Sequence, residues 1–398
     1  MPAAPSAPTH AALEPLEQDG ARQRPRALFL GKTYAGWRTR FLNLQAHIQQ
    51  DGRLDASFRE VTGWRPEGRL ERMPWLPPAV TGRLRAVLDA APFAAYPRPD
   101  VIWSSASEAL LPYLWSQAPR LRRPLVLELD WTLAQQEQFA GPYFGRDSRQ
   151  GASLAFARCR ERAVWHTATA FVAWSRWARD SLLQQGVAED RVRVIPPGVD
   201  LGWWSPGMTS RQDAPLRLLF VGGDFARKGG PELLAALAAL PGGTCELDIV
   251  TPTAPAVPPG VRGHNLQANS VELRELYRNA DLFILPTKAE CLGIAAIEAM
   301  ACALPVVMTD VGGARDIVVD GESGWLLQSP QDLGQALGAV LQDRERLKAM
   351  GLAARARAEC LFDGTANDRR LVDLLLSLSG LRGGQDGRPA RRPPADRP

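Results

Sequence analysis

The segment ILPTKAECLGIAAIEAMACALPVV, from Ile284 to Val307, decides the fold of the second half of the chain. An apolar, strand-like stretch at Asp281–Leu285 ends at Pro286, because proline cannot donate to a sheet ladder. The small and apolar residues of Ile294–Ala303 predict a helix, and Pro305–Met308 predicts a second strand. A strand, a loop, a helix and a further strand form a βαβ unit, whose right-handed crossover makes the two strands parallel.

Two carboxylates interrupt this apolar pattern. Glu290 lies in the predicted loop at the carboxyl end of the first strand, where open α/β sheets bind ligands. Glu298 lies one turn into a helix that is otherwise built of small and apolar residues, and such a helix is buried. A buried carboxylate is costly unless it accepts hydrogen bonds. An internal salt bridge or a helix-cap contact can supply them; we favour a ligand with paired hydroxyls, such as a ribose.

Groups suited to phosphate follow the first predicted strand of the second half. The sequence FVGGDFARKGG at 220–230 places Gly222 and Gly223 in a turn, and Arg227 and Lys228 before a helix that begins near Gly230. Glycines allow a close backbone approach, a helix start offers unpaired amides, and a guanidinium grips phosphate through two donors. A solvated basic turn is the alternative. Because the whole chain has only four lysines, we favour a diphosphate site.

Composition narrows the class of protein. The 398 residues suggest two domains, and 45% hydrophobic with 23% charged residues is an ordinary globular balance. A net charge of +4 gives no basis for nucleic-acid binding. Five cysteines without a Cys-x-x-Cys spacing favour neither a disulfide framework nor a zinc site. We find no signal-peptide pattern and no apolar stretch of about 18 residues, so we expect a cytoplasmic protein.

Strand-like and helix-like stretches alternate along both halves, which predicts parallel sheets with helices on both faces. In the first half the predicted strands are Arg26–Leu30, Val101–Trp103, Pro124–Leu129, Ala170–Trp174 and Val192–Ile195. In the second half they are Leu216–Val221, Cys245–Val250, Asp281–Leu285 and Pro305–Met308. Residues 1–24, rich in Pro and Ala, and residues 380–398, rich in Gly, Pro and Arg, are predicted to be disordered.

Several residues in one register resemble a known family. Glu290 and Glu298 are eight positions apart with Gly293 between them, and EAMACALPVVMTDVGG runs from 298 to 313. This pattern resembles the E-x7-E signature of retaining glycosyltransferases, and more narrowly that of family 4, which has the GT-B fold. The sequence PPGVD at 196–200 is similar to the IPNGVD that closes the first domain in that family.

The resemblance implies an α/β protein with the GT-B fold. Two Rossmann-like parallel-sheet domains then face one another across a cleft, and a C-terminal helix crosses back to the first domain. We expect an N-terminal acceptor domain at 25–200, a linker at 201–215, a nucleotide-sugar domain at 216–362 and the crossing helix at 363–378.

The resemblance also implies roles for the site residues. Glu290 lies near the anomeric carbon of the sugar, and Glu298 accepts from the ribose. Arg227 and Lys228 hold the departing diphosphate, so no metal is required, and the nucleotide-diphosphate sugar is a co-substrate rather than a cofactor. The expected donor-binding residues are Gly222, Gly223, Arg227, Lys228, Leu292, Gly293, Ile294 and Glu298, of which Leu292, Gly293 and Ile294 act through backbone amides.

The first half departs from the family pattern in two places. Asp130 stands where the family often has a histidine that touches the donor sugar. Asp130 can accept from a sugar hydroxyl, Glu128 can do so in its place, or the role is structural; we include Asp130 among the catalytic residues. The glycine-rich turn on the acceptor side is matched only loosely, by Gly31 and Thr33.

The predicted function is a retaining, metal-independent hexosyl transfer from a nucleotide-diphosphate sugar to an acceptor hydroxyl. The acceptor is a glycan, a lipid-linked molecule or a small molecule, in polysaccharide, glycolipid or small-glycoside biosynthesis. A lipid-linked acceptor would bring peripheral contact with the inner face of a membrane. Two alternatives remain: another GT-B enzyme, such as an epimerase or a phosphorylase, whose characteristic residues we do not find, and a non-catalytic nucleotide-sugar-binding subunit.

Overall fold

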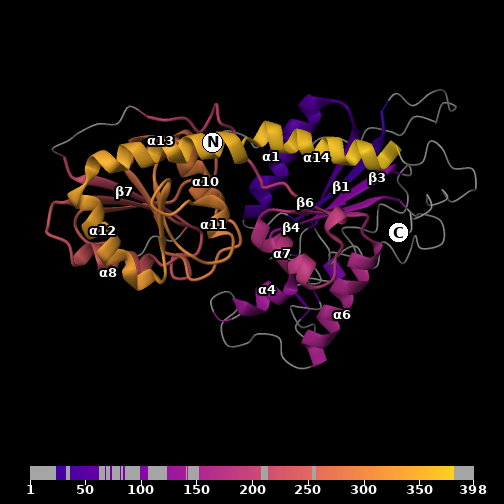
Figure 1. Cartoon of the computed structure of the whole chain (residues 1–398), viewed down its shortest axis with the longest axis horizontal. Helices are drawn as coiled ribbons and strands as arrows, with labels where there is room; N and C mark the ends of the chain where they lie inside the picture. Colours follow the sequence, from indigo (N-terminus) through magenta and orange to yellow (C-terminus); the bar gives the residue numbers. More distant parts are fainter. Residues whose placement is uncertain are drawn as a thin grey trace, which may run out of the picture.

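The structure is a computed structural model with two α/β units side by side (Figure 1). It describes residues 24–32, 36–61, 99–105, 123–139, 152–207, 214–252 and 257–380, with isolated positions at 68, 72, 73, 81, 84, 85 and 141. The predictions made for residues 1–23, for Thr33 and for residues 381–398 lie outside the described residues.

The first half of the chain forms a six-stranded parallel sheet in the order β2-β1-β3-β4-β5-β6. Five of these strands overlap the predicted ones, whereas β2 was missed. β2 lies at the sheet edge and most of its residues are exposed or half-buried, so it has no continuous apolar run. The strands are β1 (Arg26–Lys32), β2 (Asp55–Val61), β3 (Val101–Ser104), β4 (Leu125–Leu129), β5 (Ala170–Ala173) and β6 (Val192–Val194).

Helices cover both faces of this sheet, as the alternating pattern predicted. Along β4, Val126 belongs to the core on one face, while Leu125 and Leu127 belong to the core on the other, because side chains alternate along a strand. The first core includes residues of α1 and α14, and the second includes residues of α6 and α7. The helices are α1 (Gly36–Asp51), α4 (Leu133–Gln138), α6 (Ala152–Thr167), α7 (Arg176–Gln184) and α14 (Gly364–Ser379).

The second half forms another six-stranded parallel sheet, in the order β12-β11-β10-β7-β8-β9. Its strands are β7 (Leu216–Val221), β8 (Cys245–Val250), β9 (Val261–His264), β10 (Leu282–Leu285), β11 (Val306–Thr309) and β12 (Gly324–Leu327). Its helices are α8 (Gly230–Ala238), α9 (Val271–Asn279), α10 (Ile294–Ala301), α11 (Ala314–Ile317), α12 (Leu333–Gln342) and α13 (Arg344–Leu361). β9 and β12 were not predicted.

The predicted βαβ unit is present as β10, α10 and β11, with the two strands paired in parallel. Six of the eight residues of α10 are buried, Glu298 among them, so the expectation of a buried helix is confirmed. On its outer side α10 packs against α13. The central segment of the sequence is thus enclosed on both sides.

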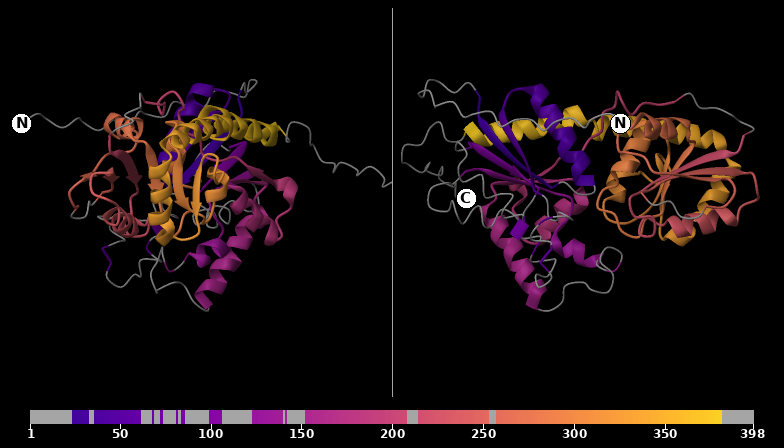
Figure 2. Two further views of the ribbon diagram at one scale, coloured as in Figure 1. Left: turned by 60° about the vertical axis from the view of Figure 1, so that its left-hand side comes forward. Right: turned by 180° about the vertical axis from the view of Figure 1, so that it is seen from behind.

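The chain crosses between the two units twice, at adjacent points. The amide of Val199 donates to the carbonyl of Phe362 at 2.9 Å, and the amide of Gly364 donates to the carbonyl of Val199 at 3.0 Å. Gly198 is required here, because a Cβ atom would lie 2.3 Å from the Cα of Gly364. After the second crossing α14 packs on α1 and β3, and the views in Figures 1 and 2 show it lying over the first sheet. The predicted fold, including the crossing helix, is confirmed.

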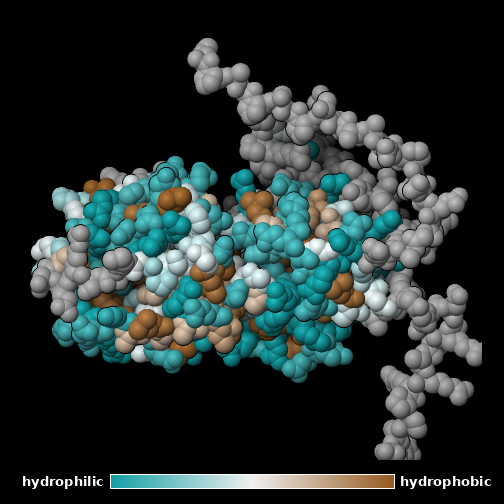
Figure 3. Space-filling view, turned by 90° about the horizontal axis from the view of Figure 1, so that it is seen from above, coloured by the Kyte–Doolittle hydropathy of each residue, from teal (hydrophilic) through white to brown (hydrophobic). Residues whose placement is uncertain are grey.

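Hydrophobic side chains are scattered over the face that carries α13 and α14 (Figure 3). Among the described residues the large apolar side chains that are exposed come from separate segments: Leu42, Leu84, Phe156, Val271 and Leu352. None of the described helices combines the length and the hydropathy needed to cross a bilayer. Peripheral membrane contact therefore stays a prediction.

Candidate functional site

A cleft of ≈630 Å³ lies between the two sheets, and both halves of the chain line it. All eight expected donor-binding residues and Glu290 line its second-domain side: Gly222, Gly223, Arg227, Lys228, Glu290, Leu292, Gly293, Ile294 and Glu298. The first domain contributes Gly36, Trp37, Thr39, Asp130, Trp131 and Trp174. The fold therefore brings together residues that are far apart in sequence, while their roles remain predictions.

The basic loop between β7 and α8 is shaped by glycines. Gly229 has a φ of +82°, and a Cβ atom there would lie 1.9 Å from the carbonyl oxygen of Pro286, so only glycine allows the two loops to meet. At Gly222 a Cβ atom would lie 3.0 Å from the side chain of Lys228, whereas Gly223 has no other atom within 4 Å of that position. The loop thus holds Lys228 closely and leaves backbone accessible beside it.

The two cations of this loop are anchored to the loop that carries Glu290. Lys228 forms an ion pair with Glu290, and both side chains are largely buried, at 14% and 8% exposure. The guanidinium of Arg227 donates to the carbonyl of Ala289 at 2.8 Å and lies 3.4 Å from the carboxylate of Asp224. An ammonium group has three donors, so Lys228 can contact Glu290 and an anionic ligand together.

Two glycines after β11 hold the Glu290 loop in place. Gly312 has a φ of +59°, and a Cβ atom there would lie 1.7 Å from the carbonyl oxygen of Glu290. The amide of Gly313 donates to the carbonyl of Cys291 at 3.0 Å, and a Cβ atom on Gly313 would lie 2.4 Å from that oxygen. This close backbone packing gives the sequence VGG at 311–313 a physical role, which is to fix the backbone beneath Glu290.

The start of α10 lines the cleft. Gly293 is the N-cap residue and provides no side-chain cap. Leu292, Gly293 and Ile294 all line the cleft, and across it a Cβ atom on Gly36 would lie 3.4 Å from the side chain of Ile294. The starts of α1 and α10 thus approach one another from the two domains. The positive ends of their dipoles favour an anion between them.

Glu298 lies at the cleft with a partner that the sequence interpretation missed. It is 7% exposed, and the hydroxyl of Tyr277, on α9, donates to its Oε2 at 3.0 Å. The same hydroxyl lies 3.1 Å from the carbonyl oxygen of Ala295. Burial raises the pKa of Glu298 to about 7, against the opposing effect of the Tyr277 hydrogen bond. Within the described part of the chain no cation pairs with Glu298, and the protein itself supplies only part of its hydrogen bonding.

Asp130 follows β4 and lies where the cleft meets the first domain. Burial raises the pKa of Asp130 above its ordinary value, while the positive charge of Lys32 and hydrogen bonding from Trp37 and Cys291 act in the opposite direction. Cys291 belongs to the second domain and is the neighbour of Glu290. Asp130 therefore sits at the junction of the two domains, beside the loop that carries the other candidate catalytic carboxylate.

Two other expectations for the first domain need correction. Glu128 cannot replace Asp130 at a sugar, because its buried carboxylate already accepts from Arg40, Trp103 and Trp174. Gly31 lies within β1 rather than in a glycine-rich turn. A Cβ atom on Gly31 would lie 2.1 Å from the ring of Phe41, so the glycine makes room for α1 to pack on the sheet.

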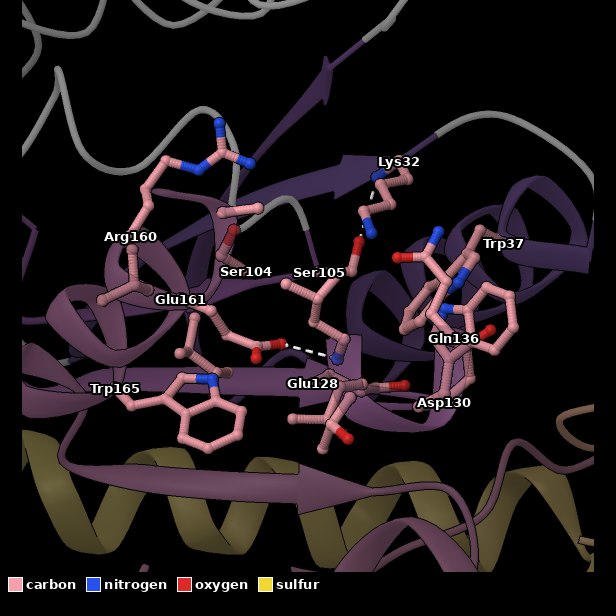
Figure 4. Close-up of a pocket in the computed structure, with 17 residues that line it drawn as sticks. Lys32, Trp37, Ser104, Ser105, Glu128, Asp130, Gln136, Arg160, Glu161 and Trp165 are labelled. Atoms are coloured by element: carbon pink, nitrogen blue, oxygen red, sulfur yellow. Dashed lines mark hydrogen bonds between the residues drawn. The ribbon is translucent and has the colours of Figure 1, made fainter. Parts of the chain in front are cut away.

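A second, smaller hollow of ≈130 Å³ lies in the first domain beside the cleft (Figure 4). It shares Trp37, Asp130 and Trp131 with the cleft and lies at the carboxyl ends of β1, β3 and β4. In Figure 4, Lys32 and Arg160 lie on opposite sides with Ser104 and Ser105 between them. Its further polar residues are Glu128, Thr132, Gln136 and Glu161.

The sequence alone gives no sign of this second hollow. Its polar residues come from β1, the end of β3, β4 and the residues just after it, α4 and α6, and no local motif joins them. The Oε1 atom of Glu161 accepts from the amide of Leu133 at 2.9 Å, which ties α6 to the start of α4. Among the described residues there is no cluster of His, Cys, Asp and Glu with the geometry of a metal site.

Comparisons with known proteins extend over both domains. The model of the family described as Glycosyltransferase Family 4 matches residues 44–203, and that of Glycosyl transferases group 1 matches residues 264–357. A D-inositol 3-phosphate glycosyltransferase from Nocardia farcinica is 35% identical over 46% of this chain and 46% of its own length. An alpha-maltose-1-phosphate synthase from Mycolicibacterium smegmatis is 29% identical over 50% of this chain and 55% of its own. The chain spans about half the length of the curated relatives that it matches.

Solved structures agree over nearly the whole chain. The sucrose-phosphate synthase of Thermosynechococcus elongatus superposes with a TM-score of 0.72 at 20% identity, over 90% of this chain and 99% of that chain. The Anabaena protein HepE, in its complex with UDP-glucose, gives a TM-score of 0.62 at 19% identity, over 89% and 100%. Together with the two parallel sheets, these similarities show that the chain has the two-domain GT-B fold.

Proposed function

We propose that this GT-B protein transfers a sugar from a nucleotide-diphosphate sugar to an acceptor hydroxyl and retains the anomeric configuration. The observation that carries the proposal is the ion pair between Lys228 and Glu290 inside the cleft, with Arg227 and the start of α10 beside it. A cation and a carboxylate held in contact can stabilise the two charges that develop during glycosyl transfer. These are the negative charge on the leaving group and the positive charge on the sugar.

The second domain holds the donor in this proposal. The diphosphate lies between the Arg227–Lys228 loop and the amides of Leu292, Gly293 and Ile294. Glu298 accepts from the ribose hydroxyls through the oxygen that Tyr277 does not contact. Similarity to the two family models supports this arrangement, because each domain matches a glycosyltransferase description. The cations at the diphosphate take the place that a metal ion would otherwise fill.

The substrates themselves supply the leaving group and the proton acceptor of the transfer step. The bond between the anomeric carbon and the phosphate oxygen breaks while the acceptor oxygen bonds to the same face of that carbon. The proton of the acceptor hydroxyl goes to an oxygen of the departing phosphate. Glu290 stabilises the oxocarbenium-like transition state, and Arg227 and Lys228 stabilise the leaving diphosphate. Asp130 accepts from a hydroxyl of the donor sugar on the opposite wall of the cleft.

The acceptor enters from the first domain, through the hollow lined by Lys32, Ser104, Ser105 and Arg160. Its donors, acceptors and flanking tryptophans suit a compact polyhydroxylated ligand, on which an indole can stack. Two relatives, an inositol-phosphate glycosyltransferase and a maltose-phosphate synthase, have names that agree with a small polyol or sugar acceptor. Such a reaction belongs to the biosynthesis of small glycosides, glycolipids or polysaccharides in the cytoplasm.

The competing proposal is a subunit that binds a nucleotide sugar without turning it over. A panel of nucleotide-diphosphate sugars, screened by thermal shift, identifies the donor because a ligand of the folded state raises the melting temperature. Hydrolysis of that donor without acceptor then separates an enzyme from a binding subunit. Binding without hydrolysis or transfer would establish the subunit. Retention is checked from the anomeric coupling in the NMR spectrum of the product, and metal independence from activity in the presence of EDTA.

A further inference from the structure

A buried charge network lies behind the first-domain wall of the cleft. Arg40, on α1, donates from Nε to Oε1 of Glu128, on β4, at 2.9 Å, and it also pairs with Asp368, on α14. Arg40, Glu128 and Asp368 are each only 2% exposed. His47 adds a contact of 2.5 Å to Asp368. Three elements that are distant in sequence thus meet at charged groups inside the domain.

Two indoles complete the hydrogen bonding of Glu128. Trp174 donates from Nε1 to Oε1 at 2.7 Å, and Trp103 donates from Nε1 to Oε2 at 2.8 Å. A buried ion pair of this kind often adds no stability over well-packed apolar residues, because desolvation offsets the attraction between the charges. The network instead fixes the orientation of the side chains that donate to Glu128, since each donor can satisfy its hydrogen bond only in one orientation.

The two indoles lie in different surroundings. The ring of Trp174 lies 4.2 Å from that of Trp37, and both rings line the cleft. Trp37 and Asp130 line the cleft and the smaller hollow together, and interaction with Trp37 lowers the pKa of Asp130. Trp103 instead packs among Phe29 and Phe41 in the core and is fully buried. One carboxylate therefore orients one indole of the cleft wall and one indole of the core, and the two Nε1–carboxylate oxygen distances are nearly equal.

We propose that Glu128 is a positioning residue for the cleft. It holds Trp174, which supports Trp37, so that Asp130 stays beside the Glu290 loop. Figure 4 shows Glu128, Asp130 and Trp37 at the same end of the hollow. Arg40 extends the arrangement to Asp368, so the docking of α14 on the first domain is linked to the geometry of the site. The inference rests on the proposed function only in that Asp130 serves the transfer.

The test compares Trp174→Phe with Trp103→Phe. Each variant removes one indole N–H from the same carboxylate and keeps an aromatic ring, so both should lower the melting temperature to a similar extent. Trp174→Phe should lower kcat by about tenfold, which corresponds to about 1.4 kcal/mol of transition-state stabilisation. Trp103→Phe should change kcat by less than about twofold, and neither should change the KM for the donor. Equal losses of kcat in the two variants would mean that the network is structural only.

A second readout does not depend on activity. The protein is labelled with 5-fluorotryptophan, and the ¹⁹F resonance of Trp37 is assigned from its absence in Trp37→Phe. We expect this resonance to shift or broaden in Trp174→Phe and to stay unchanged in Trp103→Phe. An unchanged Trp37 resonance in both variants would overturn the positioning role. If the wild type shows no transfer or hydrolysis with any donor, the proposed function fails while this measurement still decides the inference.

Discussion

The hydroxyl of Tyr277 donates to Oε2 of Glu298 at 3.0 Å, across the interface between α9 and α10. This contact places a neutral donor, not a cation, on the buried carboxylate of the cleft. The carboxylate therefore keeps an elevated pKa of about 7, and the residue lines the cleft. The protonation state of Glu298 then changes within the ordinary working range of pH.

Replacing Tyr277 with Phe should make donor binding more sensitive to pH. The hydrogen bond from Tyr277 lowers the pKa of Glu298, so its loss raises that pKa further and reduces the fraction of carboxylate near neutrality. We expect the Kd of the nucleotide to increase most near pH 7 and to approach the wild-type value at about pH 9. Isothermal titration calorimetry over this pH range measures the Kd of the variant and of the wild type. A loss of affinity that is equal at every pH would contradict the explanation.

Glu298→Gln should stabilise the ligand-free protein at alkaline pH. A carboxyl whose pKa rises from 4.5 to about 7 on folding is most favourable in its protonated form. The stability associated with it is present below the unfolded value and is lost as pH rises through about 7. The amide carries no such charge. The free energy of unfolding of the variant should therefore exceed that of the wild type by an amount on the order of 3 kcal/mol above pH 8, and by little near pH 4.5.

Chemical denaturation at the two pH values tests that prediction, and a pH-independent difference would show that the charge of Glu298 is not the cause. The same variant should bind the nucleotide more weakly at high pH, because the amide is a poorer acceptor for ribose hydroxyls than the carboxylate. Greater stability with weaker binding is the combination expected of a residue retained for its ligand.

Lys228→Ala and Glu290→Gln should each reduce transfer by about 100-fold or more, as loss of a charge at a developing transition state does. Circular dichroism should show the fold intact in both. Lys288→Ala is the matched control, because Lys288 lies in the same loop as Glu290 but pairs with Glu232 at 2.7 Å and does not line the cleft. Near-native turnover in both cleft variants would remove the basis of the proposed function.

Gly312→Ala should lower both stability and activity. Alanine at a φ of +59° costs about 1–3 kcal/mol, and its Cβ would lie 1.7 Å from the carbonyl oxygen of Glu290, so the catalytic loop must move. Gly334→Ala is the contrasting variant. It lies in α12 with no atom near its Cβ position, and alanine there should stabilise by about 0.5–1 kcal/mol without affecting activity. Thermal unfolding measures the stability of the two variants, and transfer rates measure their activity.

The sequence predicted strands from their continuous apolar runs, and this succeeded where a strand is buried on both faces. β10 and β11 are fully buried, and their residues are apolar except for Thr309 at the end of β11. The prediction missed three edge strands, β2, β9 and β12, of which β2 and β9 carry polar side chains that solvent can reach. In β9, His264 contacts Asp248 of the neighbouring strand β8 at 2.7 Å. Pairing with a neighbouring strand, not local hydrophobicity, forms such an edge.

By itself, the sequence determined the two parallel sheets, the buried helix with its carboxylate and the basic loop after β7. Each of these follows from local periodicity and from glycines next to chemically distinctive residues. The tertiary structure alone decided which groups meet: Lys228 with Glu290, Tyr277 with Glu298, and Arg40 with Glu128 and Asp368. Such pairs join residues that are 21 to 328 positions apart, and only the packing of whole elements brings their side chains within reach.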